Sequence, residues 1–206
     1  MRHFLTAVWL TLTLMPLHTR ADATDELLQK LAPVKTLSGR FEQTQTVQGS
    51  DRVLLSSGHF RLLRPGYFAW DITSPDSQLI LATPEYLWQY DRDLETVTRR
   101  STAEADGVSP LQVLGGDEAA IRADYRIDTI DNKGERFQLK PLDKAAGFRS
   151  LVLRFKGDTI DGMNIVDSLG QSIEVHFFDV KHNTSLAPED FSFSPPAGAD
   201  LFYHDQ

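Results

Sequence analysis

The 206-residue chain contains no cysteine. This excludes disulfide bonds, thiol catalysis and metal sites that need a thiolate ligand. It also excludes a lipid anchor on a cysteine behind a signal peptide, which an exported lipoprotein needs. A chain of this length can bury a core large enough to fold without disulfides, so the absence is compatible with an exported protein.

Clusters of basic residues are also lacking. The chain has 21 Lys and Arg against 29 Asp and Glu, a net charge of −8. Nucleic acids and anionic membrane surfaces are bound by clustered Lys and Arg, so we expect neither as a partner. Arg99 and Arg100 form an isolated pair, which we interpret as a solvated strand end. Beyond residue 17, no apolar run is long enough to cross a membrane.

Motifs of catalysis are missing as well. The chain has no G-x-S-x-G elbow, no phosphate-binding glycine loop and no H-E-x-x-H sequence. His59, His176, His182 and His204 have no metal-ligand spacing among themselves. We therefore predict no catalytic residues, no metal site and no cofactor, and a protein that is not an enzyme.

The first 23 residues have the pattern of a signal peptide. Arg2 and His3 precede an apolar stretch at residues 4–17, and Ala21-Asp22-Ala23 is a small-x-small cleavage site. We predict cleavage after Ala23 and a single domain over residues 24–206.

Strand patterns dominate the rest of the chain. Residues 61–91 contain three apolar runs separated by turn sequences such as Pro65-Gly66. Leu62-Leu63 and Tyr67-Phe68 place large apolar groups on both faces, so both faces need cover. Further strands are predicted at residues 39–46, 52–63, 95–100, 125–130, 136–140, 151–155, 159–166 and 172–180. Short strands with tight turns favour a sequential antiparallel sheet.

Two segments have helical patterns, one before the first strand and one that interrupts the strands. The first follows Thr24 or Asp25, either of which can cap it, and Pro33 should end or kink it near Leu31. The second begins at Ser109-Pro110 and stops at Gly115-Gly116, after which Asp117 can cap another short helix. Helices this short must rest on a sheet. From the residues alone, the second segment is equally a lid or a plug at one end of the sheet.

Several motifs, in this order and spacing, resemble the LolA family of periplasmic outer-membrane lipoprotein carriers. They are GRFEQ at residues 39–43, RPGYFAW at 64–70, Pro75, LWQYD at 87–91, DFSF at 190–193 and PPAG at 195–198. The resemblance implies an incomplete, unclosed antiparallel β-barrel covered by an N-terminal helix and a short helical lid. It also implies a periplasmic location.

The same resemblance implies a function and its residues. Such a carrier accepts acylated lipoproteins from an inner-membrane ABC transporter and delivers them to an outer-membrane receptor. Leu111 and Leu114 would belong to the lid, and Arg64 would latch the lid shut in the empty form. We expect the protein to be a monomer. The candidates for the hydrophobic cavity are Phe60, Leu62, Phe68, Trp70, Ile80, Met163 and Ile165.

Alternatives to these interpretations stay open at this point. Each cavity candidate, taken alone, fits plain core packing, and Arg64 fits a solvated arginine at a strand end. An accessory carrier or a sensor that binds another lipid or hydrophobic ligand would need the same cavity.

Overall fold

The computed structural model of the protein describes residues 22–47, 49, 52–102 and 110–204, with the side chains of residues 111 and 112 excepted. The predicted signal peptide therefore lies almost wholly outside the described residues. None of the described helices is long and apolar enough to cross a membrane.

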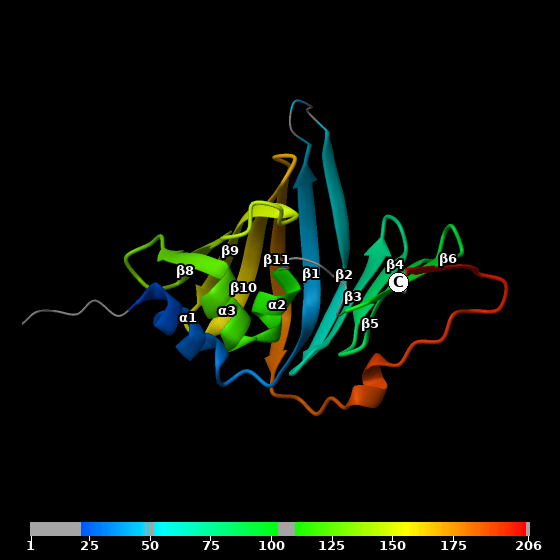
Figure 1. Cartoon of the computed structure of the whole chain (residues 1–206), viewed down its shortest axis with the longest axis horizontal. Helices are drawn as coiled ribbons and strands as arrows, with labels where there is room; N and C mark the ends of the chain where they lie inside the picture. The colour runs from blue at the N-terminus through cyan, green and yellow to red at the C-terminus, as the bar shows by residue number, and fades with distance from the viewer. Residues whose placement is uncertain (1–21, 48, 50–51, 103–109, 205–206) are drawn as a thin grey trace, which may run out of the picture.

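A single twelve-stranded sheet forms the body of the protein (Figure 1). Its order is β12-β6-β5-β4-β3-β2-β1-β11-β10-β9-β8-β7. The strands are β1 (Thr36–Thr46), β2 (Val53–Leu63), β3 (Tyr67–Ser74), β4 (Gln78–Ala82), β5 (Tyr86–Asp91), β6 (Thr96–Ser101), β7 (Tyr125–Thr129), β8 (Arg136–Pro141), β9 (Phe148–Lys156), β10 (Thr159–Asp167), β11 (Ser172–His182) and β12 (Asp200–His204).

The sheet does not close into a barrel. Hairpin neighbours pair in sequence order, β1 joins β11 in the middle, and β7 and β12 are left as the two outer strands. Consecutive strands β6 and β7 therefore lie at opposite parts of the sheet instead of pairing. This confirms the predicted mainly β fold with an open, incomplete barrel. Every pair is antiparallel except β12 with β6.

Three helices lie on one face of the sheet, which we call the inner face (Figure 1). Helix α1 (Ala23–Leu31) ends just before Pro33, as predicted. Its cap is Asp22, whose carboxylate accepts from the Thr24 amide at 3.2 Å, so the expectation of Thr24 or Asp25 as the cap was wrong.

The other two helices follow each other closely in the chain. They are α2 (Pro110–Gly115) and α3 (Glu118–Asp124). Asp117 caps α3 as predicted, accepting from the Ala120 amide at 3.0 Å. The predicted cap of α2, Ser109, lies outside the described residues.

Apolar side chains cover both faces of the sheet, as the sequence of residues 61–91 required. The inner face carries the main core, beneath the helices. On the outer face Ala69, Leu81 and Phe191 form a smaller buried cluster. Phe191 belongs to a 3₁₀ turn, η1 (Pro188–Phe191), and its ring lies 5.6 Å from that of Tyr67. The segment after β11 thus covers the outer face.

Strand β12 was not predicted. All five of its residues are exposed, so no alternation of apolar and polar residues marks it in the sequence. The Arg99 guanidinium lies 4.4 Å from the ring centroids of both Tyr86 and Tyr203, which links β12 to β5 and β6. The interpretation of Arg99 as a solvated residue was therefore wrong.

Phe191→Ala is expected to lower the free energy of unfolding by about 3–5 kcal/mol, because it removes a large side chain that is 1% exposed. Phe202→Ala, in β12 at 52% exposure, is the matched control and should change little. Urea unfolding of both variants measures this. If both variants lowered the free energy of unfolding equally, the buried Phe191 would contribute no more to stability than the exposed Phe202.

Candidate functional site

Arg64 joins two helices to the sheet. It directly follows β2, and its side chain reaches the C-terminal ends of α1 and α2. Nη1 donates to the Leu31 carbonyl at 2.5 Å, while Nε and Nη2 donate to the Leu114 carbonyl at 3.2 and 2.8 Å. Carbonyls in the last turn of a helix have no partner within the helix. One side chain therefore donates to the ends of both helices, and the Leu31 carbonyl accepts in addition from the Val34 amide at 3.1 Å.

The charge of Arg64 suits this position. Burial lowers the pKa of its guanidinium to about 10, which still leaves it charged at neutral pH. A cation is favourable at the C-terminal end of a helix, and hydrogen bonds from a charged donor contribute about 1.5–3 kcal/mol each. The contacts of Arg64 are therefore strong enough to hold α2 against the sheet.

Gly116 makes room for this arginine. It follows α2 with a φ of +67°, a conformation that favours glycine. A Cβ at this position would also overlap the Arg64 guanidinium. The glycine that ends α2 is thus required both by its backbone and by the side chain packed against it.

Gly116→Ala is expected to displace the guanidinium and loosen α2. We expect hydrogen exchange of the α2 and α3 amides to become about tenfold faster, because losing one charged hydrogen bond corresponds to at least that factor. Gly115→Ala is the control, since a Cβ there meets no atom within 4 Å. Equal exchange in the two variants would mean that Arg64 does not restrain α2.

The predicted cavity residues lie together on the inner face. Six side chains, including Leu114 from α2, are at most 6% exposed, and Ile80 and Ile165 pack against them partly buried. The helices therefore cover this apolar surface in the present conformation. The six side chains that are at most 6% exposed are Phe60, Leu62, Phe68, Trp70, Leu114 and Met163. The side chain of Leu111 lies outside the described residues.

Stacked aromatic rings form the centre of this surface. The ring of Trp70 lies 3.7 Å from that of Phe41, at an angle of 18°, and 5.9 Å from that of Phe68. The ring of Phe60 lies 4.7 Å from that of Phe177. Phe41 and Phe177 were not predicted as part of the surface. Their pairing across β1 and β11 explains their presence, and that pairing joins strands far apart in the sequence.

Comparison with known proteins decides the family. The model of the family described as "Outer membrane lipoprotein carrier protein LolA" matches residues 32–194. The chain belongs to the LolA family. A relative from Methylibium petroleiphilum, named outer-membrane lipoprotein carrier protein, is 35% identical over 94% of this chain and 96% of its own. Another with that name, from Neisseria meningitidis, is 33% identical over 93% of this chain and 92% of its own.

Solved structures support the same fold. A LolA superfamily protein from Nitrosomonas europaea aligns over 82% of this chain and 97% of its own, with 17% identity and a TM-score of 0.50. An uncharacterized conserved protein from Thermus thermophilus aligns over 88% and 97% of the two chains, with 14% identity and a TM-score of 0.50. At these identities the likeness extends to the fold alone.

A polar cleft of about 1070 Å³ lies elsewhere in this LolA family member, between α1 and the β7–β8 turn. Asp22, Glu26 and Asp131 line it, and none of the predicted cavity residues does. Its polar lining does not suit a hydrocarbon ligand. Among the residues that the structure describes, no group of three His, Asp or Glu side chains could hold a metal ion.

Proposed function

We propose that this LolA family member carries acylated lipoproteins, whose acyl chains bind on the inner face of the sheet. The observation that carries the proposal is the Arg64 contact with both α1 and α2, the helices that cover this face. Displacing these helices would uncover a continuous surface of apolar and aromatic side chains. The names of the relatives agree with this cargo.

The energetics of the cargo explain why a carrier is needed. Each methylene removed from water contributes about 0.8 kcal/mol, so the acyl chains of one lipoprotein represent tens of kcal/mol, in order of magnitude. Release into water would therefore be too slow to be useful. The carrier must pass its cargo directly to another apolar site, a transfer that involves no covalent step and no catalytic residue.

The two helices would work as a cover with a latch. Arg64 favours the closed form through its bonds to Leu31 and Leu114, and cargo favours the open form by occupying the inner face. Competition between the two keeps the free energy of loading modest, so an acceptor can remove the cargo. Leu111 and Leu114 belong to the moving helix α2 in this scheme.

The setting of the proposal is the periplasm. An inner-membrane lipoprotein-releasing ABC transporter would load the carrier, and an outer-membrane lipoprotein receptor would unload it. The mature protein would be residues 24–206, a monomeric single domain left after cleavage of residues 1–23, so the Asp22 cap of α1 would belong to the precursor alone.

Mass spectrometry of material co-purified with the protein from the periplasm tests the proposal. Acylated lipoproteins bound to the wild-type protein are the expected result. Free lipids or polyenes alone would instead assign it to an accessory pathway, and the absence of any acylated ligand would contradict a carrier function. Phe68→Glu, which places a charge on the inner face, is the control that should co-purify without lipoprotein.

A further inference from the structure

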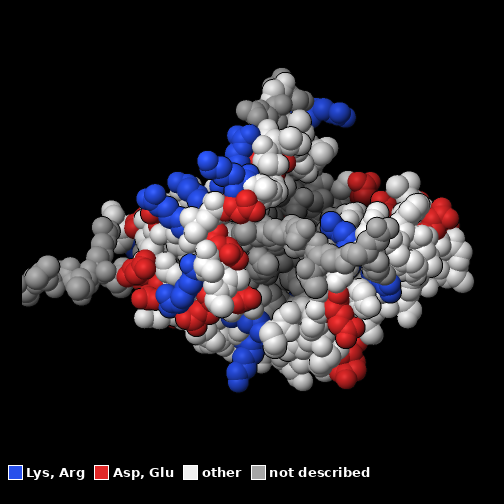
Figure 2. Space-filling model, viewed as in Figure 1, with Lys and Arg blue, Asp and Glu red and all other residues white. Residues whose placement is uncertain are grey.

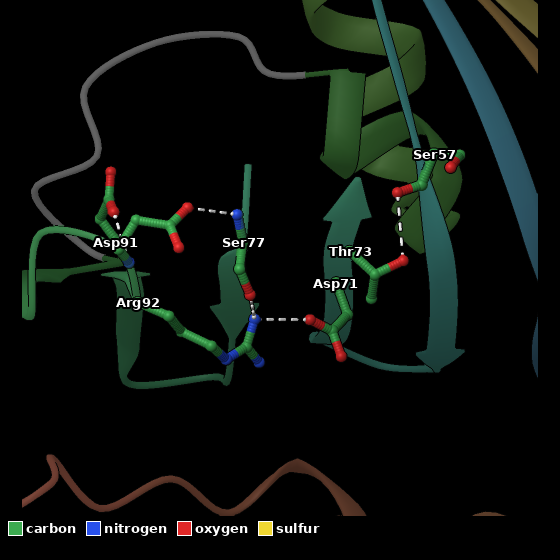
Figure 3. A network of polar contacts seen from close by, with 7 residues as sticks. Ser57, Asp71, Thr73, Ser77, Asp91 and Arg92 are labelled. Atoms are coloured by element: carbon green, nitrogen blue, oxygen red, sulfur yellow. Dashed lines mark hydrogen bonds and ion pairs between the residues drawn. The ribbon is translucent and has the colours of Figure 1, made fainter. Parts of the chain in front are cut away.

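The hairpin of β1 and β2 extends beyond the neighbouring strand. Strands β1 and β2 pair from Thr36–Leu63 to Thr46–Val53. Strand β3 accompanies β2 only as far as Ser57, where the Thr73 hydroxyl donates to the Ser57 carbonyl at 3.4 Å (Figure 3). Over Val53–Ser56, no described strand pairs with the second side of β2. Figure 1 shows this part of the hairpin projecting from the body.

Two features mark the place where β3 ends beside this projection. Arg92 Nη1 donates to Asp71 Oδ1 at 2.9 Å and to Ser77 Oγ at 3.3 Å, which ties β3 to the turns beside it (Figure 3). Between the pairs Ser57–Ser74 and Gly58–Ile72, β3 carries one extra residue, Thr73, and this bulge bends β3 where it leaves β2. Beyond the end of β3, no strand among the described residues covers the second edge of β2.

The open edge offers hydrogen-bonding groups of the backbone. The Val47 amide donates to the Arg52 carbonyl at 3.4 Å, so residues 47 and 52 form a hydrogen-bonded pair. In an antiparallel ladder such pairs alternate with pairs that point outward. Val53 and Leu55 therefore direct their N–H and C=O groups away from β1, whereas those of Leu54 point towards β1.

The side chains of this edge are apolar and exposed. Val53, Leu54 and Leu55 are 54%, 51% and 66% exposed. Neither residues 53–56 nor the residues 43–46 that face them in β1 include a charged residue or a proline. Figure 2 shows the described part of the projecting end mostly in white, with basic side chains at its margin. Natural proteins usually protect edge strands with charge, proline or cover, so an edge without them fits strand pairing with another chain.

We propose that the β2 edge over Val53–Ser56 is a docking site for an extended strand of a partner protein, which adds to the sheet beside β2. A membrane suits this edge less well, because the outward backbone groups would stay unpaired in hydrocarbon. A second copy of the chain suits it less well too. Four residues span only about 13 Å of strand. An edge this short buries much less surface than the roughly 800 Å² per partner of a stable dimer interface. An edge this short favours weak, reversible binding to a partner protein.

Amide hydrogen exchange, followed by NMR, tests the docking site directly. In the free protein we expect fast exchange at Val53 and Leu55 and slow exchange at Leu54. Two proteins from the same bacterium serve as probes: the outer-membrane lipoprotein receptor without its lipid anchor, and the periplasmic domain of the inner-membrane ABC transporter. This choice of probes rests on the proposed function. One of them should slow exchange at Val53 and Leu55 about tenfold and leave Leu54 unchanged.

Variants of Leu55 test whether the edge matters for transfer. Leu55→Pro removes the outward N–H and is tolerated at a strand edge, and we expect it to slow transfer to or from the bound partner about tenfold. Leu55→Ala keeps the N–H and should slow transfer less. Acyl-chain binding should be unchanged in both. If Leu55→Pro does not fold, the exchange experiment on the wild-type protein decides.

Provided that the wild-type protein carries lipoprotein, three results would overturn the docking site. The first is unchanged exchange at Val53 and Leu55 with both probes. The second is a concentration-dependent dimer, seen by sedimentation, that Leu55→Pro abolishes. The third is binding through this edge to vesicles of phosphatidylethanolamine and phosphatidylglycerol. If the wild-type protein carries no lipoprotein, the proposed function is refuted. Amide hydrogen exchange at Val53 and Leu55 with the two probes would still test the docking site.

Discussion

Arg64→Leu is expected to fold and to load lipoprotein but to deliver it about tenfold more slowly, or worse. The variant loses all three hydrogen bonds to the Leu31 and Leu114 carbonyls. Each bond from a charged donor contributes about 1.5–3 kcal/mol to the closed form, and 1.4 kcal/mol changes an equilibrium about tenfold. Without them, closing no longer competes with the bound cargo, so the loaded form becomes too stable to unload.

Transfer from preloaded carrier to the purified receptor measures this effect. Arg61→Leu is the matched control, because Arg61 lies on the outer face, 5.7 Å from the ring centroid of Phe191, and contacts neither helix end. It should deliver at the wild-type rate. Delivery by Arg64→Leu at the wild-type rate would mean that the arginine only stabilises the fold.

Phe68→Glu is expected to abolish lipoprotein binding while the protein stays folded. Phe68 is 4% exposed beneath the helices, among the rings of the inner face. A carboxylate placed against hydrocarbon costs several kcal/mol, so affinity should fall at least about a hundredfold. The carboxylate can still reach water if α2 moves away, which lowers stability without unfolding the sheet.

Equilibrium binding of a fluorescent acyl ligand, together with circular dichroism, measures both parts of this prediction. Phe68→Leu keeps the apolar character and should still bind. Complete unfolding of Phe68→Glu would show that Phe68 belongs to the permanent core, and its assignment to the binding surface would then be wrong.

Most of the sheet could be predicted from the sequence, because its strands are local hairpins marked by turn residues. The pairing of β1 with β11 and of β12 with β6 could not, since each joins segments distant in the chain. Asp22 was missed as a cap because Thr24 and Asp25 are also good cap residues. Arg99 was misread because its aromatic partners come from two other strands, β5 and the unpredicted β12.

In the candidate site, too, local features could be predicted from the sequence and long-range contacts could not. Arg64 stood out as a charge within an apolar block, and the family resemblance suggested its contact with a helix end. That Leu31 is a second acceptor depends on where α1 ends in space, which no motif encodes. Gly116 was recognised only as a helix stop, because its closeness to Arg64 depends on how α2 packs against a segment distant in the chain. The roles of the cavity residues remain predictions.

Release of a radiolabelled lipoprotein from inner membranes tests the central claim most directly. Spheroplasts that synthesise palmitate-labelled lipoprotein would be incubated with the purified mature protein. The account predicts that the label appears in the soluble fraction as a complex with the wild-type protein and stays in the membrane with Phe68→Glu. Label that remains in the membrane with the wild-type protein, or that leaves it equally with both, would contradict the claim that the inner face carries acyl chains.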